Sequence, residues 1–269
     1  MYSVEDLRTI VEDALFSGIH EPESYSSYLE EAQKYSISAG GKRLRPCILL
    51  SVCEMLGGNV ADALPYACAL EYIHTYSLIH DDLPAMDNDD FRRGKPSNHK
   101  AFGEDIAILA GDGLLTRAAE LMSEDMIGSI SAGKVYAFNA ILSCAYDMVK
   151  GQIADIKAVD VPDDEYFNFV HRNKTAALYL AAFQAGAYLA EADDESLTDM
   201  SKAGIIFGMA FQLYDDYLDI DTDKTLSYAQ YLGKDKSKEM IAEYLDRLSE
   251  IIAKYENNET LRALTLPEI

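Results

Sequence analysis

Runs of alternating polar and apolar residues, the pattern of a half-buried strand, are scarce along this chain, whereas Ala, Leu, Glu, Lys and Met are abundant. The prolines leave residues 97–161 and 163–266 free of this helix-breaking residue, so long helices can form there. No internal repeat, low-complexity tract or linker interrupts the sequence. The pattern predicts an all-α protein, a single domain over residues 1–269 with about ten helices.

The expected helix boundaries follow from glycine and proline. Gly40 and Gly41 should end the second helix, GGKRLRP should open the third with Pro46 in its first turn, and Pro65 should begin the fourth. The first two helices are expected over residues 3–17 and 24–38, two long ones over 104–127 and 131–158, one ending near Ile220 and the next beginning near Leu226.

One stretch, EYIHTYSLIHDDLPAMDNDDFRRGKPSNHK over residues 71–100, combines an apolar run with a dense set of charges. Burying so many charges is costly unless something pairs them. Carboxylates at this density suit Mg²⁺, which takes oxygen ligands and often keeps substrate phosphates in its shell, and the adjacent arginines suit phosphate oxygens. The stretch indicates a metal–diphosphate site, and the alternative is a solvated acidic loop after a core helix. The aspartates and arginines of this stretch are Asp81, Asp82, Asp87, Asp89, Asp90, Arg92 and Arg93.

Pro84 lies between Asp82 and Asp87. This spacing is looser than a helical pair, so we expect a distorted helix end that brings Asp87 back towards Asp81. His74 falls about 20° from Asp81 on the helical wheel, where it is either a satisfied core histidine or a ligand.

A second acidic stretch, FQLYDDYLDI over residues 211–220, favours the metal interpretation. Asp215 and Asp219 lie about 40° apart on one helical face, and Gln212 precedes them by one turn on the same side. Apolar neighbours make unpaired carboxylates expensive, so these acids should face a cavity or a metal. Two such helices facing each other could hold a metal cluster between them.

Lys42, Arg43 and Arg45 fall at the predicted start of the third helix. Backbone N–H groups and the helix dipole already favour an anion there. The alternative is a basic loop on an acidic protein.

The bulk composition limits the partners. A formal net charge of −23 argues against nucleic acid or an anionic membrane as a partner, and the proposed anionic ligands require local cations that reverse the sign. No apolar run reaches the roughly 18 residues of a membrane span. The acidic, amphipathic start MYSVEDLRTIVEDAL is not that of a signal or transit peptide. Cys47, Cys53, Cys68 and Cys144 have no metal-ligand spacing and are expected to be buried, reduced thiols in a cytoplasmic protein.

The motifs together resemble those of the trans-isoprenyl diphosphate synthases. IHDDLPAMDNDDFRRGKP and YDDYLD are similar to the two aspartate-rich motifs of that family. GGKRLRP, GQIAD over residues 151–155 and Lys174 with Thr175 match further family landmarks in the same order. The resemblance covers nearly the whole chain, and the bacterial farnesyl type is the most similar.

The resemblance implies the type I isoprenoid synthase fold, a helical bundle around a central cavity, in a cytoplasmic homodimer. It implies Mg²⁺-dependent head-to-tail condensation of isopentenyl diphosphate with dimethylallyl or geranyl diphosphate, giving farnesyl diphosphate and free diphosphate. Three Mg²⁺ ions would be bound by Asp81, Asp87, Asp215 and Asp219. The implied catalytic residues are Asp81, Asp82, Asp87, Arg92, Lys174 and Asp215, and the implied substrate-binding residues are Lys42, Arg45, His74, Tyr76, Arg92, Arg93, Lys174, Thr175 and Gln212.

Tyr76 lies five residues before Asp81, and the resemblance makes this aromatic the floor of the product pocket, typical of a fifteen-carbon product. The ideal wheel places Tyr76 about 140° from Asp81, so periodicity does not show that it lines the pocket. From the residues alone, Gln152 and Asp155 fit a solvent-facing polar stripe equally well, and Lys174 fits a surface charge.

Three other functions stay open: a geranylgeranyl diphosphate synthase, a class I terpene cyclase, and a non-catalytic subunit of a prenyl diphosphate synthase. A cyclase would not need Lys42, Arg45, His74 and Arg93, and a non-catalytic subunit would be marked by degraded aspartate motifs, whereas both motifs are complete.

The segment after Asp219 departs from the family pattern. DIDTDK is too short for the Gly- and Lys-rich loop that the resemblance implies, and the sequence ends TLPEI where the family has a basic tail. We expect additional residues between Asp223 and Lys224, whose Cα atoms would then lie much farther apart than the roughly 3.8 Å of neighbours in a chain. A normal peptide bond there would mean a shortened active-site lid.

Overall fold

The computed structural model describes residues 1–157, 159–222 and 226–265, and in this part of the chain the protein is all-α except for one short hairpin. The predicted fold class is confirmed. The N-terminal elements are α1 (Val4–Ser17), α2 (Ser27–Ile37), α3 (Leu44–Met55), α4 (Val60–Asp81), the antiparallel pair β1 (Phe91–Arg92) and β2 (Lys95–Pro96), α5 (Asn98–Phe102) and α6 (Glu104–Gly128). The rest are α7 (Ala132–Ile156), α8 (Asp164–Val170), the π-helix η1 (His171–Ala176), α9 (Ala177–Leu189), α10 (Asp194–Leu218), α11 (Tyr228–Leu232), α12 (Lys234–Ile252) and α13 (Glu259–Thr265).

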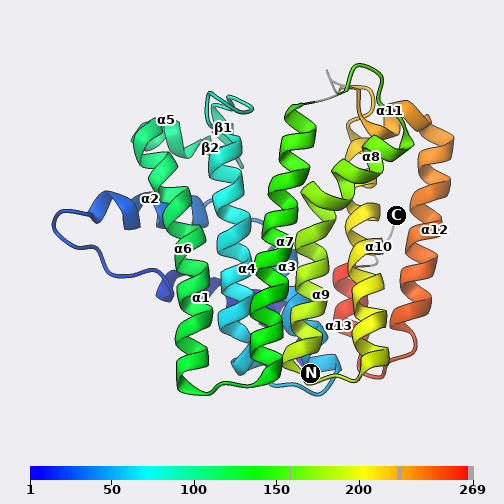
Figure 1. Cartoon of the computed structure of the whole chain (residues 1–269), viewed down its shortest axis with the longest axis horizontal. Coiled ribbons are helices and arrows are strands. Elements are labelled where there is room, and N and C mark those ends of the chain that lie inside the picture. The colour runs from blue at the N-terminus through cyan, green and yellow to red at the C-terminus, as the bar shows by residue number, and fades with distance from the viewer. Residues whose placement is uncertain (158, 223–225, 266–269) are drawn as a thin grey trace.

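The long helices stand side by side in one bundle (Figure 1). The carboxyl ends of α4, α7 and α10 all lie at the upper end of the bundle in this view, together with the β1–β2 hairpin, α8 and α11. The chain therefore brings the ends of three long helices, and with them both acidic motifs and the GQIAD motif, to the same end of the molecule.

Side-chain caps define where these three helices begin. The Asn59 side chain accepts a hydrogen bond from Ala61 N at 3.0 Å at the start of α4. Ser131 and Asp193 cap α7 and α10 in the same way. Such caps satisfy backbone N–H groups that have no partner within the helix. They set the start of each helix that carries a motif.

Two predicted boundaries were wrong. Pro65 does not begin the fourth helix, because α4 starts five residues earlier at Val60 and Pro65 lies inside it. Near the amino end a proline removes only one backbone hydrogen bond, and the Asn59 cap sets the start of α4 before Pro65. The second helix begins at Ser27 rather than at residue 24.

The core is organised around α9, ALYLAAFQAGAYL, which is apolar on almost all sides. It packs against α3, α7 and α10, and at Gly186 a Cβ atom would lie 2.5 Å from the carbonyl oxygen of Leu49 on α3. A helix that is hydrophobic all round belongs in the centre of a bundle. The four cysteines are buried and free, as predicted, and burial raises the pKa of the Cys47 thiol to about 12.

A buried ion cluster connects the start of α3 to α1 and α4. The Arg43 guanidinium, 2% exposed, donates to Glu12 at 2.7 Å, to Glu71 at 2.8 Å and to the carbonyl oxygen of Ile37 at 2.6 Å. Arg43 itself has a left-handed backbone, with φ at 49°. Three fixed partners hold this conformation and so fix the loop that carries Lys42.

No helix in residues 1–157, 159–222 or 226–265 is long and apolar enough to cross a membrane.

The Arg43 cluster generates a stability prediction. Glu71→Ala should lower the free energy of unfolding by about 3–5 kcal/mol, because it leaves a buried guanidinium short of a counter-charge. Lys234→Ala removes an exposed ion pair with Asp221 and should change stability by less than about 1 kcal/mol. Urea unfolding followed by circular dichroism measures both, and equal losses would show that the buried cluster has no special role.

Candidate active site

Two adjoining cavities occupy the end of the bundle where the motifs meet. The apolar cavity has a volume of about 410 Å³ and the basic cavity about 700 Å³. Arg45, His74, Leu78 and Thr175 line both, so the cavities share a wall. The apolar cavity is also lined by Tyr76, Ser77, His80, Asp81, Met86, Met148, Val149, Gln152, Ile153, Ile156, Lys174 and Leu178. The basic cavity is also lined by Ala39, Gly41, Lys42, Arg43, Leu44, Glu71, Arg92, Arg93, Tyr179, Phe211, Gln212 and Asp215.

The chain turns back on itself directly after α4. Asp87 N donates to the carbonyl oxygen of Asp81 at 2.9 Å, and Asn88 N donates to that of Leu83 at 3.1 Å. This is the distorted helix end that Pro84 predicts. The turn brings the backbone of Asp87 next to that of Asp81, six residues earlier in the chain, whereas a continued helix would have carried Asp87 away.

The two aspartates at the end of α4 have different surroundings. Asp82 is 2% exposed and accepts from Arg92 Nε at 2.9 Å, with a second close contact from Arg92 Nη2. Asp81 lines the apolar cavity, and no described residue hydrogen-bonds to its carboxylate or forms an ion pair with it. Arg92, predicted to bind substrate, is here the partner of Asp82 and Asp89.

Burial disfavours the charged form of the Asp81 carboxyl group and raises its pKa to about 6. The positive charge of Lys174 opposes this rise, and the negative charge of Asp87 adds to it. Burial likewise raises the pKa of Asp87. A carboxylate that is poorly solvated and lacks a partner gains most from a bound cation.

The second motif repeats this division of roles. Asp216 accepts from Gln212 Nε2 at 2.8 Å and from Tyr228 N at 3.2 Å, and lies 3.1 Å from His171 Nε2. Although burial opposes it, these partners hold the pKa of Asp216 below its usual value. Asp215 has no such partner among the described residues, and burial raises its pKa. Gln212 therefore contacts Asp216 rather than Asp215, its expected neighbour.

The predicted metal ligands do not form a closed cage. Within the described residues, no three Asp, Glu, His or Cys side chains lie close enough to hold an ion by themselves. Mg²⁺ is commonly bound through one or two carboxylates together with substrate phosphates and water. Unpaired, part-buried carboxylates such as those of Asp81 and Asp215 suit this mode of coordination, so the donor set fits Mg²⁺ together with a phosphate ligand.

The π-helix η1 presents the Lys174–Thr175 pair. Lys174 Nζ lies 2.5 Å from Asp155 Oδ2, and Thr175 Oγ1 donates to Gln212 Oε1 at 2.6 Å. Although burial opposes the charge, Asp155 raises the pKa of Lys174, as do Asp81 and Asp87. Single π-turns are frequent at functional sites. Lys174 is therefore a lining cation and not a solvent-exposed surface charge.

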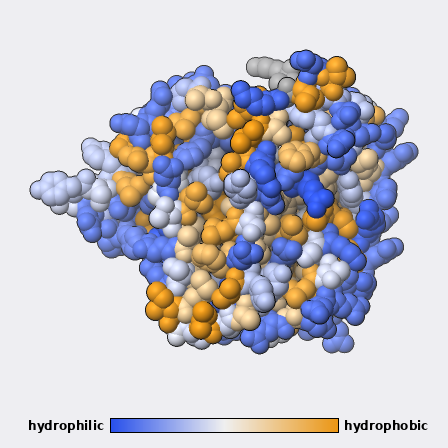
Figure 2. Space-filling model, viewed as in Figure 1, coloured by the Kyte–Doolittle hydropathy of each residue, from blue (hydrophilic) through white to orange (hydrophobic). Residues whose placement is uncertain are grey.

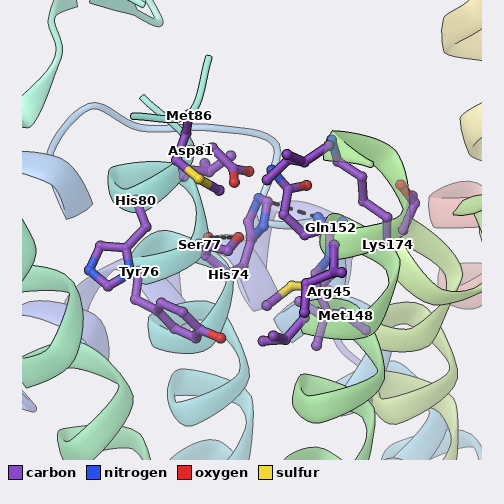
Figure 3. A pocket seen from close by; sticks show the side chains of 16 residues that line it. Arg45, His74, Tyr76, Ser77, His80, Asp81, Met86, Met148, Gln152 and Lys174 are labelled. Atoms are coloured by element: carbon purple, nitrogen blue, oxygen red, sulfur yellow. Dashed lines mark hydrogen bonds between the residues drawn. The ribbon is translucent and has the colours of Figure 1, made fainter. Parts of the chain in front are cut away.

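Gly151 of the GQIAD motif allows η1 to approach α7. A Cβ atom at Gly151 would lie 2.1 Å from Lys174 N and 2.6 Å from its Cα. Figure 3 shows Lys174 and Gln152 across the cavity from Asp81 and His74. Gln152 Nε2 is buried without a hydrogen-bond partner among the described residues. Of the two alternatives for GQIAD, the lining position is therefore the observed one for Gln152.

Positively charged side chains line the basic cavity, on the other side of the shared wall. Arg45 lies over the Tyr179 ring, 4.4 Å from its centroid, and its Nη1 donates to His74 Nε2 at 3.3 Å. Burial and the neighbouring arginines hold the pKa of His74 well below its usual value, so this imidazole is neutral and accepts the hydrogen bond. Lys42 is exposed at the mouth of the basic cavity. Arg93 contacts the carbonyl oxygen of Gly40, where the absence of a side chain at Gly41 leaves room for the guanidinium.

Tyr76 lines the same cavity as Asp81, although the helical wheel separates them by about 140°. The cavity surrounds the last turns of α4, with residues 74, 76, 77, 78, 80 and 81 all in its lining, so it is not confined to one face. Asp219, the remaining predicted metal ligand, is exposed just beyond the end of α10.

The sequence did not reveal every residue of this site. His171 and Tyr228 both contact Asp216, yet neither lies in one of the recognised motifs. Asp155, from the recognised GQIAD motif, contacts Lys174. The run HRNKT offered a signal for His171, because it stands three residues before Lys174. The predicted break between Asp223 and Lys224 lies outside the described residues.

The fold and the site define an all-α protein with two aspartate motifs facing a divided cavity. The chain belongs to the polyprenyl synthetase family, whose model matches residues 26–240.

Individual relatives agree with this assignment. Over 237 residues the chain is 44% identical to a geranylgeranyl diphosphate synthase of Cyanophora paradoxa, covering 87% of this chain and 77% of that one. Over 219 residues it is 42% identical to the chloroplastic geranylgeranyl pyrophosphate synthase of Catharanthus roseus, covering 80% of this chain but only 60% of the relative's length. The crystal structure of an FPP/GFPP synthase from Zymomonas mobilis superposes with a TM-score of 0.91 at 30% identity, covering 98% of this chain and 96% of that one.

The contact between Gly151 and η1 generates a packing prediction. Gly151→Ala should lower the free energy of unfolding by about 1–3 kcal/mol, because the added methyl group forces α7 and η1 apart. Gly128→Ala is the matched control, since nothing lies within 4 Å of its Cβ position. That control should leave stability unchanged or raise it by up to about 1 kcal/mol. Thermal unfolding compares the two, and equal stabilities would contradict the close approach.

Proposed function

We propose that this protein condenses isopentenyl diphosphate with an allylic diphosphate, lengthening the isoprenoid chain and releasing diphosphate. The observation that carries the proposal is the shared wall of the two cavities. Unpaired carboxylates lie on both sides of it, cations line the basic cavity, and a mostly apolar space adjoins them. A substrate with an anionic head and a hydrocarbon tail fits this division.

The basic cavity suits the diphosphate of isopentenyl diphosphate. In this proposal Lys42, Arg45 and Arg93 bind phosphate oxygens, because charged donors form strong hydrogen bonds to such anions. His74 orients the Arg45 guanidinium by accepting a hydrogen bond from it. This donor set distinguishes a two-substrate condensation from a terpene cyclase, which binds only the allylic substrate.

The allylic diphosphate belongs at the carboxylates. Asp81, Asp87, Asp215 and Asp219 would hold Mg²⁺, and the predicted three ions remain an expectation from the family. When bound, Mg²⁺ supplies Lewis-acid stabilisation of the leaving diphosphate. Lys174 adds a positive charge beside Asp81 and Asp87. Thr175 is held near this head group by Gln212.

Asp82 and Arg92 are both among the predicted catalytic residues, and their side chains hydrogen-bond to each other. Asp82 acts in this proposal by holding Arg92, so that the guanidinium faces the site at a fixed angle. A phosphate oxygen can occupy those Arg92 donors that Asp82 does not use.

The chemical step needs no nucleophilic side chain. The allylic C–O bond breaks, and its electron pair leaves with diphosphate. The double bond of isopentenyl diphosphate then forms the new C–C bond, and a proton passes from the adduct to the departed diphosphate. The apolar cavity keeps water away from the allylic cation, which water would quench. The lining of this apolar cavity includes the side chains of Met86, Met148 and Leu178.

Tyr76 limits the length of the product in this proposal, and we expect farnesyl diphosphate. The side chain is 7% exposed and lines the apolar cavity a turn below Asp81. The alternative product is geranylgeranyl diphosphate, which the names of the Cyanophora and Catharanthus relatives favour. Both products come from the same chemistry and differ only in the number of condensations.

The homodimer, the cytoplasmic location and the single domain over residues 1–269 stay predictions. Figure 2 shows hydrophobic residues over the middle of the face formed by α6 and α7, with hydrophilic residues towards its right-hand side. Exposed apolar side chains on these helices include Leu109, Tyr136, Tyr146 and Ile153. Such a face suits burial against a second copy, the homodimer expected from the family.

Incubation with isopentenyl and dimethylallyl diphosphates, with and without Mg²⁺, tests the proposed function. Chain-length analysis of the dephosphorylated products should show fifteen-carbon material that requires both substrates and the metal. Conversion of geranyl diphosphate alone would indicate a cyclase. No turnover by the folded protein under any condition would favour a non-catalytic subunit.

Removal of the unpaired carboxylates should abolish turnover without unfolding the protein. We expect Asp81→Ala, Asp87→Ala and Asp215→Ala each to lower kcat by about 10²-fold or more, because the ligands act as a unit. Helicity by circular dichroism should stay unchanged. Asp246→Ala, an exposed acid on α12, is the control and should keep full activity. Near-normal activity in any of the three variants would remove that residue from its proposed role.

Truncation of Tyr76 should lengthen the product. Tyr76→Ala opens the apolar cavity below Asp81, so twenty-carbon or longer products should replace the wild-type product. Tyr25→Ala, which removes a fully exposed tyrosine, should leave the product unchanged. An unaltered product distribution in Tyr76→Ala would show that another residue sets the length.

A further inference from the structure

His80 lines the apolar cavity beside Tyr76, and the proposed function gives it no role. The two rings lie one helical turn apart on α4, with centroids 5.7 Å apart and planes at 75°, an edge-to-face arrangement. Figure 3 shows His80 and Tyr76 next to each other on the same side of α4. Aromatic pairs of this geometry attract each other beyond their buried area.

The His80 ring is fixed from the opposite side by α6. Its Nε2 lies 3.0 Å from the carbonyl oxygen of Ile108. A carbonyl only accepts, so Nε2 carries the hydrogen. At Gly111 a Cβ atom would lie 2.1 Å from the same nitrogen, so a side chain there would displace the ring. The α6 backbone thus holds His80, and His80 supports the edge of Tyr76.

We infer that His80 is a positioning residue for product length. It acts through Tyr76: together with the space left by Gly111, it fixes the position of the Tyr76 ring, which closes the product cavity. This inference rests on the proposed function. A tyrosine side chain alone has more than one staggered rotamer. Held on one side by a fixed imidazole, the ring stays across the cavity, whereas without His80 it can turn into the space beside α6. The cavity then deepens, and the growing chain can accept further isoprene units.

The test is the product ratio, which is independent of total turnover. His80→Ala should raise the ratio of twenty-carbon and longer products to the fifteen-carbon product by about two- to tenfold, the range that loss of one such ring contact gives. His80→Gln keeps a donor for Ile108 O but lacks the ring, so its shift should be intermediate. It also provides the test if His80→Ala does not fold. His20→Ala, an exposed histidine paired with Glu120, is the matched control and should leave the ratio unchanged.

A double variant separates positioning from a general structural role. Because His80 is inferred to act through Tyr76, the Tyr76→Ala/His80→Ala double variant should give the same product distribution as Tyr76→Ala alone. Wild-type ratios in folded His80→Ala and His80→Gln, or a further lengthening in the double variant, would overturn the inference. If the wild-type protein forms product and the variants do not change its length, only this inference fails. If the wild-type protein forms no product, the proposed function fails with it.

Discussion

The pairing of Asp82 with Arg92 and of Asp216 with His171 and Gln212 is the interaction on which the site depends. In each acidic motif one aspartate is anchored to the protein, and its neighbour is left without a partner. The anchored carboxylates have their charge compensated and fix the ends of α4 and α10. Their neighbours, Asp81 and Asp215, are part-buried and have raised pKa values, so they favour a cation. In a protein with a formal net charge of −23, the lysines and arginines that line the two cavities supply the local positive charge that an anionic ligand needs.

Close backbone packing supplies the rest of the geometry. Gly151 lets η1 lie directly on α7, which sets the position of Lys174. Gly111 does the same for His80 on the facing helices α4 and α6. At both places a missing side chain brings a functional side chain to the cavity wall. The buried Arg43 cluster fixes the loop before α3, which carries Lys42 to the basic cavity.

The sequence predicted those features that depend on neighbours along the chain. The all-α fold followed from the scarcity of alternation, and the return of Asp87 to Asp81 followed from Pro84. The position of Arg45 in the first turn of α3 followed from the glycines and Pro46. What escaped prediction depends on contacts between distant elements. The partner of Asp216 is His171 on η1, and Tyr76 reaches the cavity because the cavity surrounds the end of α4. Helical periodicity carries no information about either.

We propose that the unpaired carboxylates bind metal only together with a diphosphate. Isothermal titration calorimetry of the wild-type protein with Mg²⁺ alone, pyrophosphate alone and both together tests it most directly. We expect weak binding of each ligand alone, and pyrophosphate binding that Mg²⁺ tightens about tenfold or more, because the carboxylates supply only part of the metal shell. Asp81→Asn and Asp215→Asn should each remove this coupling. Tight binding of Mg²⁺ without pyrophosphate, or pyrophosphate binding that does not depend on Mg²⁺, would contradict joint binding at these carboxylates.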